Sequence, residues 1–274
     1  MTDLSDPALD AEAMALLEEA AKPKRRVRPR LARRLADAQD LQVDTPNGPV
    51  MAWRLGDGPA CLLVHGWEDD NALWSPMIDA CTDIFRAVVV LDLPGHGFSP
   101  SEAHSVDAAG EAIVAVAKAL GPIDSVIAHS FGCPSTIYAL AHGLSVDKAV
   151  MIASPMPRTK GRDEETWNRR WKDKQVERGA DPEVVDRAAE LMAAEWQGRA
   201  GGQALIEADI PSMTAKALIL HSMDDEVCPF ANSQEMAARW PGSALFPLDG
   251  LGHRLIAQDS EVIARAIAFV DDFG

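Results

Sequence analysis

Two hydrophobic patterns alternate along the chain from residue 41 onward. Short apolar runs, typical of strands buried on both faces of a parallel sheet, are separated by longer segments with apolar residues at helical spacing. The predicted strands are residues 50–54, 61–65, 87–92, 125–129, 148–153, 217–221 and 244–248. The predicted helices are residues 105–120, 134–142, 230–240 and 259–269. This alternation predicts an α/β fold with a mostly parallel sheet flanked by helices.

One long insertion interrupts the alternation. Roughly 60 residues separate the fifth and sixth predicted strands, whereas a crossover between parallel strands needs only a dozen or more. The insertion contains two helical patterns, at 164–178 and 182–196, and the second begins with Asp181 as N-cap followed by Pro182. Because it leaves the sheet at a strand end, the insertion is placed to act as a helical lid.

The N-terminal segment follows neither pattern. Residues 10–21 have apolar positions at helical spacing, and residues 22–34 carry eight Lys or Arg and no acidic residue. The whole chain has 26 basic and 42 acidic residues, a formal net charge of −16. We interpret the basic segment as an arm that lies on its own acidic body. The alternatives are an anionic membrane, a partner chain or nucleic acid, although so acidic a body repels nucleic acid.

These observations divide the chain into three parts. They are an N-terminal helical and basic arm at 1–40, an α/β core at 41–154 and 213–274, and a helical lid insertion at 155–212.

Cysteine usage and apolar run length predict the compartment. The four cysteines, at positions 61, 81, 133 and 228, form no C-x-x-C pair and are expected to be buried free thiols in a reducing environment. No N-terminal stretch resembles a signal peptide, and the strand-like apolar runs are far shorter than the 18 or more residues of a membrane span. We expect a cytoplasmic protein without integral membrane association, a monomer or a homodimer.

The most informative motif for chemistry is Ala128-His129-Ser130-Phe131-Gly132, at a predicted strand-to-helix turn. A nucleophilic serine on such a turn has a strained backbone and needs small residues two positions before and after it. Ala128 and Gly132 meet this requirement, so the motif reads as a G-x-S-x-G nucleophile elbow with Ala for the first Gly. The helix start also provides amide N–H groups suited to an oxyanion. Ser130 is therefore the candidate nucleophile.

A second motif, His65-Gly66-Trp67, follows the strand predicted at 61–65. A glycine just past a strand end lets the next backbone N–H turn toward the site. The N–H of Trp67 is thus the candidate second oxyanion donor, beside the N–H of Phe131. We expect His65 to hold this loop by hydrogen bonds and not to act as a base.

Two further loops follow the last two predicted strands. One contains adjacent Asp224 and Asp225, and the other contains His253 between glycine-rich residues and the last helix. Ser130, an aspartate and His253 then follow three different strands in the order Ser, Asp, His, and the carboxyl ends of those strands meet at one sheet edge. The sequence predicts a proton relay there.

Together with Asp92-Leu93-Pro94-Gly95-His96-Gly97-Phe98-Ser99, these motifs make the chain from about residue 41 resemble the α/β-hydrolase superfamily, especially its serine esterases and lipases. The resemblance implies a Ser130–His253–Asp triad. Family acid loops commonly place three residues between Asp and Pro, which favours Asp225 over Asp224 because Pro229 follows at that spacing. By the same resemblance, Asp92, His96 and Ser99 shape the floor of the site and have no role in the chemistry.

The expected function is hydrolysis of carboxylic esters through an acyl-enzyme. The substrate is expected to be a small, uncharged ester. The alternatives are another serine-nucleophile reaction (thioester hydrolysis, acyl transfer or carbon–carbon bond hydrolysis) and a hydrolase-like binding protein without turnover. No cofactor is expected, and no metal, because the histidines show no ligand spacing. The candidate substrate-binding residues are Trp67, Phe131, Trp167, Trp171 and Trp196.

Overall fold

The computed structural model describes residues 6–25, 35, 38–84, 86–155, 164–198 and 209–272. Contacts within the chain form two compact units. The sheet unit comprises Pro23–Met156 and Ile206–Gly274, and the helical unit comprises Met1–Lys22 and Pro157–Leu205.

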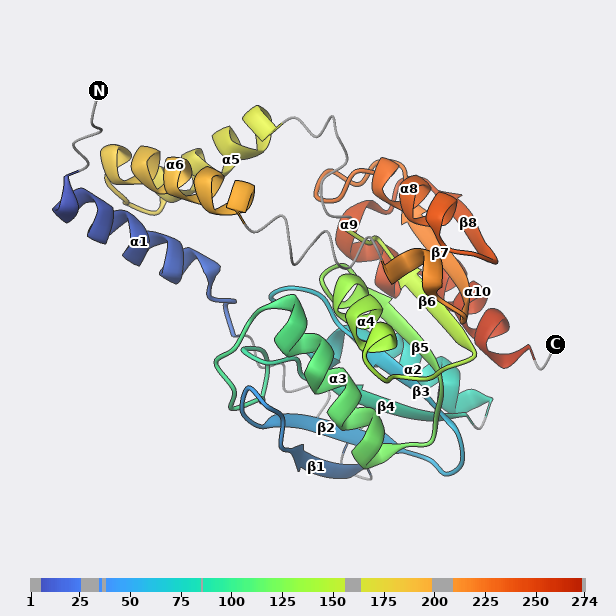
Figure 1. Ribbon diagram of the computed structural model, residues 1–274. Helices are drawn as coiled ribbons and strands as arrows, with labels where there is room; N and C mark the ends of the chain where they lie inside the picture. Colours follow the sequence, from blue (N-terminus) through green and yellow to red (C-terminus); the bar gives the residue numbers. More distant parts are fainter. Residues whose placement is uncertain are drawn as a thin grey trace. The chain divides into compact units, whose positions relative to one another are not determined.

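In the described part of the sheet unit, eight strands form one sheet (Figure 1). Along the sheet their order is β1-β2-β4-β3-β5-β6-β7-β8. Strand β2 pairs antiparallel with β1 and β4, and all other neighbours are parallel. This confirms the predicted mostly parallel sheet. The strands are β1 (Gln39–Val43), β2 (Val50–Leu55), β3 (Ala60–Val64), β4 (Ala87–Leu91), β5 (Ile123–His129), β6 (Lys148–Ile152), β7 (Lys216–Ser222) and β8 (Ser243–Leu248).

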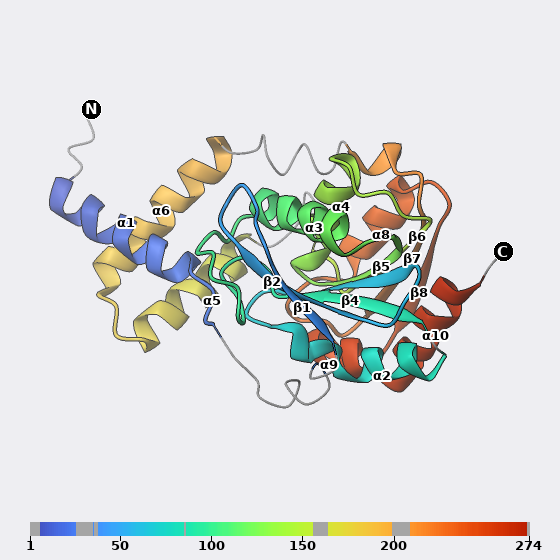
Figure 2. The same ribbon diagram turned by 90° about the horizontal axis from the view of Figure 1, so that it is seen from below.

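Helices cover both faces of this sheet (Figures 1 and 2). One face packs against α3 (Val106–Leu120), α4 (Gly132–Ala141) and α8 (Ala231–Arg239), and the other against α2 (Ser75–Asp83) and α10 (Ser260–Asp271). Short helical turns are η3 (Asn71–Trp74), η4 (Ile210–Ser212), α9 (Gly252–Leu255) and η5 (Ile256–Gln258).

The central strands are buried along their whole length. Every residue of β3 is buried, and successive residues belong to opposite cores: Leu62 packs with α3 and α4, whereas Leu63 packs with α2 and α10. A strand that alternates between two apolar layers must be apolar at every position, which is why β3 reads as a continuous hydrophobic run. The two cores hold the carboxyl ends of β3, β5, β7 and β8 in a fixed arrangement, and these ends carry the candidate site.

The helical unit contains α1 (Pro7–Ala21), α5 (Glu164–Glu177) and α6 (Pro182–Gly198). Ala13 of α1 is fully buried, as are Val185 and Ala188 of α6, and Arg187 donates to Asp10 at 2.6 Å. The N-terminal helix therefore packs with the insertion, whereas the sequence division placed it in a separate arm of residues 1–40. Periodicity shows that a helix has an apolar face but does not show which surface covers that face.

The structure also bears on the cysteines, on membrane crossing and on the basic segment. All four cysteines are buried free thiols, as expected. Within the described ranges, none of the helices has the length and apolar character that crossing a bilayer requires. Most of the basic segment, residues 26–34, lies outside the described residues, so its role stays a prediction.

Candidate active site

Ser130 lies at the turn between β5 and α4, in the strained conformation that an elbow requires. Its φ is +51°, in the left-handed region that non-glycine residues rarely adopt. The backbone N–H of Ser130 donates to the carbonyl of Ile152 at 2.9 Å, which anchors the turn to the adjacent strand β6. The residue as a whole is 9% exposed.

The small neighbours of Ser130 are explained by close backbone contacts. A Cβ on Gly132 would lie 2.6 Å from the carbonyl oxygen of His65 and 2.7 Å from that of Val64. A Cβ on Gly66 would lie 2.9 Å from the Cβ of Ser130. Strand β3, its following loop and the elbow can therefore come together only because both positions are glycine.

Replacing Gly132 with alanine is expected to destabilise the protein by about 3 kcal/mol, because the atoms that the new Cβ meets are backbone and cannot rotate away. Gly143→Ala is the matched control, since a Cβ there enters open space and only its positive φ of +119° opposes it. That change should cost about 1 kcal/mol. Urea unfolding of both variants checks the difference, and equal costs would contradict this explanation of the elbow.

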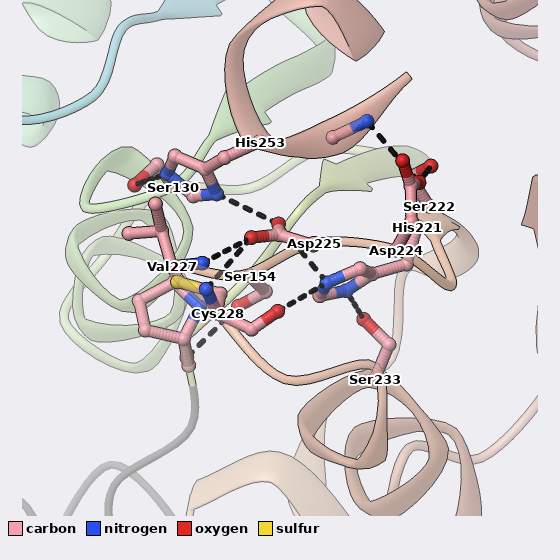
Figure 3. Close-up of polar contacts among 12 residues, drawn as sticks. Ser130, Ser154, His221, Ser222, Asp224, Asp225, Val227, Cys228, Ser233 and His253 are labelled. Carbon is pink, nitrogen blue, oxygen red and sulfur yellow. Dashed lines mark hydrogen bonds and ion pairs between the residues drawn. The ribbon is translucent and has the colours of Figure 1, made fainter. Parts of the chain in front are cut away.

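The three predicted relay residues lie together (Figure 3). The hydroxyl of Ser130 is 2.9 Å from Nε2 of His253, and Nδ1 of His253 is 2.7 Å from Oδ2 of Asp225. With the imidazole proton on Nδ1, His253 donates to the carboxylate and accepts from the serine hydroxyl. This arrangement allows His253 to take the serine proton while Asp225 holds the ring.

Asp225 is buried, and each of its oxygens accepts hydrogen bonds. Oδ1 accepts from the backbone N–H groups of Val227 and Cys228, both at 2.8 Å. Oδ2 faces His253 and also Nε2 of His221 at 3.3 Å. Burial raises the pKa of this carboxyl, but the hydrogen bonds from the two histidines and from Cys228 outweigh burial and hold the pKa below its usual range. The group is therefore an anion at neutral pH.

Asp224, the alternative acid, has a different position. Its Oδ1 accepts from the hydroxyl of Ser222 and from the backbone N–H groups of Gly250 and Gly252, the latter two at 3.1 and 3.2 Å. The hydrogen bond from Ser222 contributes most to lowering its pKa. Asp224 thus fixes the loop that carries His253, and it is Asp225 that lies against the imidazole.

His129, between Ala128 and Ser130, was not among the predicted site residues. Its Nε2–H donates to the backbone carbonyl of His253 at 2.8 Å, and the two rings lie 5.1 Å apart. Burial, followed by the nearby His253, lowers the pKa of His129 to about 4, so the ring is neutral in the working range. His129 therefore ties the elbow to the histidine loop. The one feature of the sequence that could have indicated this role is that His129 directly precedes Ser130.

Trp67 and Phe131 are both half-buried, and their rings meet edge to face with centroids 5.2 Å apart. Within the described ranges, no hydrogen bond uses the backbone N–H of either residue. Two amides without acceptors beside the nucleophile are available to bind an oxyanion, the role predicted for them.

The residues expected to shape the floor form a hydrogen-bonded scaffold. His65 donates from Nδ1 to the carbonyl of Gly66 at 2.8 Å and accepts at Nε2 from the N–H of Leu93 at 2.9 Å. His96 donates from Nδ1 to Pro94 at 2.8 Å. The bond from Leu93 connects the loop after β4 to the loop after β3, and the imidazole of His65 is occupied at both nitrogens.

Asp92, in the same scaffold, accepts from the N–H groups of Asn71 and Phe98 at 2.7 and 2.8 Å. Burial outweighs these bonds and raises its pKa to about 7. The folded state then binds a proton more tightly than the unfolded state, so this group reduces stability as pH rises toward and through 7.

Between pH 5.5 and 8 the free energy of unfolding of the wild type should fall by about 1–2 kcal/mol relative to that of Asp92→Asn, which lacks the titration. Urea unfolding at both pH values measures this, and parallel pH dependences would contradict it.

The predicted tryptophans of the insertion belong to the helical unit. Trp171 is partly buried in α5. Trp167 and Trp196 lie in α5 and α6, but their side chains are outside the described residues. A substrate-binding role for these three residues stays a prediction.

No three His, Cys, Asp or Glu side chains of the described residues gather as metal ligands would.

Comparison with known proteins places the chain in a family. Residues 61–266 match the model of the alpha/beta hydrolase family. The chain is 32% identical over 149 residues to a pimeloyl-[acyl-carrier protein] methyl ester esterase of Vibrio atlanticus, covering 54% of this chain and 53% of the relative. It is 30% identical over 155 residues to the enzyme of that name from Vibrio cholerae, covering 54% and 52%. The chain thus spans about half the length of these curated relatives.

Solved structures share the fold. An esterase of Pyrococcus furiosus matches with a TM-score of 0.68 at 17% identity, over 91% of this chain and 96% of that one. An esterase of Exiguobacterium antarcticum matches with a TM-score of 0.64 at 17% identity, over 85% and 100%. The resemblance read from the sequence motifs is confirmed: the chain belongs to the alpha/beta hydrolase family.

Proposed function

We propose that this protein is a serine hydrolase that cleaves carboxylic esters through an acyl-enzyme intermediate. The observation that carries the proposal is the relay at the carboxyl edge of the sheet: Ser130 lies 2.9 Å from His253, and His253 lies 2.7 Å from the buried carboxylate of Asp225. A serine hydroxyl is a poor nucleophile near pH 7 and needs a base at this distance.

The proposed reaction has two halves. In the first, His253 takes the hydroxyl proton while Oγ of Ser130 attacks the ester carbonyl, and the N–H groups of Trp67 and Phe131 bind the oxyanion. His253 then gives the proton to the departing alcohol, leaving an acyl-serine. In the second half, water attacks the acyl-serine while His253 takes a proton from it. His253 then returns that proton to Oγ of Ser130, and the carboxylic acid leaves. Each oxyanion donor is worth about 3 kcal/mol of barrier, by analogy with single-donor deletions.

The surroundings of the relay favour an apolar acyl group. Met223, Val227 and Leu255 are large apolar side chains that are largely exposed. The first two lie on the loop that carries Asp225, and Leu255 lies on the short helix α9 that carries His253. Exposed apolar residues close to reactive groups are typical of a ligand-binding surface. We therefore propose uncharged esters of small alcohols as substrates. Methyl esters come first, because the curated relatives are named as methyl ester esterases.

A panel of methyl esters, p-nitrophenyl esters and the matching thioesters tests the proposal. Their acyl chains have about 2 to 16 carbons, a range that a pocket of a few hundred Å³ can sort. Each ester is measured with and without an added alcohol or thiol acceptor. Hydrolysis that the acceptor leaves unchanged supports an esterase. Turnover that requires the acceptor indicates acyl transfer, and preference for the matching thioester indicates a thioesterase. If the protein binds esters but turns over none of them, the result would indicate a hydrolase-like binding protein.

A further inference from the structure

A second imidazole lies against the acid of the relay (Figure 3). His221, the sixth residue of β7, is completely buried, and its Nε2 lies 3.3 Å from Oδ2 of Asp225. That same oxygen accepts from Nδ1 of His253 at 2.7 Å. One carboxylate oxygen is thus shared by two imidazoles, and only one of them contacts Ser130.

Hydrogen bonds determine where His221 carries its proton. Its Nε2 lies 2.8 Å from the carbonyl oxygen of Cys228 as well as close to Asp225, and both of these oxygens are acceptors. Its Nδ1 lies 2.6 Å from Oγ of Ser233 in α8, whose hydroxyl can donate. The proton therefore belongs on Nε2, where it faces the carboxylate, and Ser233 stabilises that tautomer.

The groups that face the two imidazoles lie on several elements. Asp225 and Cys228 face His221 from the loop after β7, and Ser233 and the ring of Phe230 approach it from α8 and the residue before it. Asp225 and His129 face His253. Asp69 acts at longer range on His129. Within this set, Asp225 is the one group that contacts both imidazoles.

We propose that His221 is a positioning residue that acts through Asp225 to set how strongly His253 binds the serine proton. This inference rests on the proposed function. The N–H of His221 draws negative charge of the shared oxygen toward itself, so less of that charge stabilises the protonated form of His253. His253 then releases its proton to the leaving alcohol more readily. Without His221, the whole charge of Asp225 acts on His253.

The inference predicts the direction of a shift. His221→Met introduces an apolar side chain of similar length that lacks the N–H. The midpoint of the acid limb in the pH profile of kcat/KM should therefore move up by about half a pH unit. His221→Gln keeps an N–H close to the position of Nε2 and should retain the wild-type limb. If His221 had only a structural role, its replacement would loosen Asp225. Asp225 would then contact His253 less, and the midpoint of the acid limb would move to lower pH.

Ile219→Ala is the matched control. Ile219 is fully buried two residues earlier on the same face of β7, and its side chain belongs to the apolar core. This change should lower the melting temperature and leave the pH midpoint of the acid limb unchanged. The control therefore separates loss of packing in β7 from loss of the contact with Asp225.

The experiment combines the pH dependence of kcat/KM with an NMR titration of the His253 ring in the wild type and the three variants. We expect the acid-limb midpoint and the titration midpoint of His253 to move to higher pH in His221→Met. Both midpoints should stay at the wild-type value in His221→Gln and Ile219→Ala. An unchanged or lowered value in His221→Met overturns the inference. If the wild type hydrolyses no ester, the proposed function fails, and the NMR titration still decides the role of His221.

Discussion

Ester hydrolysis by the Ser130→Ala variant is expected to fall about 10⁶-fold in kcat, because the acyl-enzyme cannot form without the hydroxyl oxygen. His253 would still lie beside Asp225, and the oxyanion amides of Trp67 and Phe131 would remain. Residual turnover would then reflect binding and oxyanion stabilisation alone. The measurement is kcat on the best ester of the panel.

The melting temperature is the control for this variant. Alanine meets the same left-handed backbone strain at position 130 as serine does, since φ there is +51°. The fold should therefore keep its stability while activity is lost. Turnover within tenfold of the wild type would show that another group is the nucleophile.

The second large effect is expected for Asp225→Asn, with kcat about 10⁴-fold lower at neutral pH. The amide oxygen of the new side chain must occupy the place of Oδ1, because the N–H groups of Val227 and Cys228 both need an acceptor there. The NH₂ group then faces His253 and donates to Nδ1. The ring proton moves to Nε2, where it points at Ser130, and His253 can no longer accept the hydroxyl proton.

Asp224→Asn is the matched control, one residue away. Its carbonyl oxygen can still accept from Ser222, Gly250 and Gly252, so the histidine loop should lose only the charge-assisted part of these hydrogen bonds and kcat should fall no more than about tenfold. Steady-state kinetics on both variants give the comparison. A larger loss in Asp224→Asn would mean that the two acids have been assigned the wrong way round, and equal losses would contradict the special role of Asp225.

The sequence predicted the central strands because their residues are buried on both faces. It did not predict β1, since this edge strand pairs through its backbone and most of its side chains are exposed or partly exposed. Helix α2 was missed, because only three of its nine residues, Met77, Ile78 and Cys81, are buried apolar positions. Tertiary packing, which no local pattern records, joins α1 to α6.

The candidate site shows the same division. Ser130 and His253 could be predicted because each follows a strand in a distinctive local pattern. The choice between Asp224 and Asp225 depended on spacing to Pro229, and the structure brings Asp225 to His253. The role of His129 could not be predicted, because it depends on a contact with His253 in a distant part of the chain. The role of His221 could not be predicted either, because only the fold of the loop after β7 brings Asp225, four residues later, back against its ring. Burial and polar contacts, which only the folded chain has, give these two histidines their positions.

The most direct test of the relay is the reaction of the wild-type protein with a fluorophosphonate, followed by intact mass measurement and peptide mapping. An activated serine predicts one label per chain, on the peptide that contains Ser130, with a rate that falls as His253 becomes protonated. No label on the folded wild-type protein, or a label on another residue that persists in Ser130→Ala, would contradict the account.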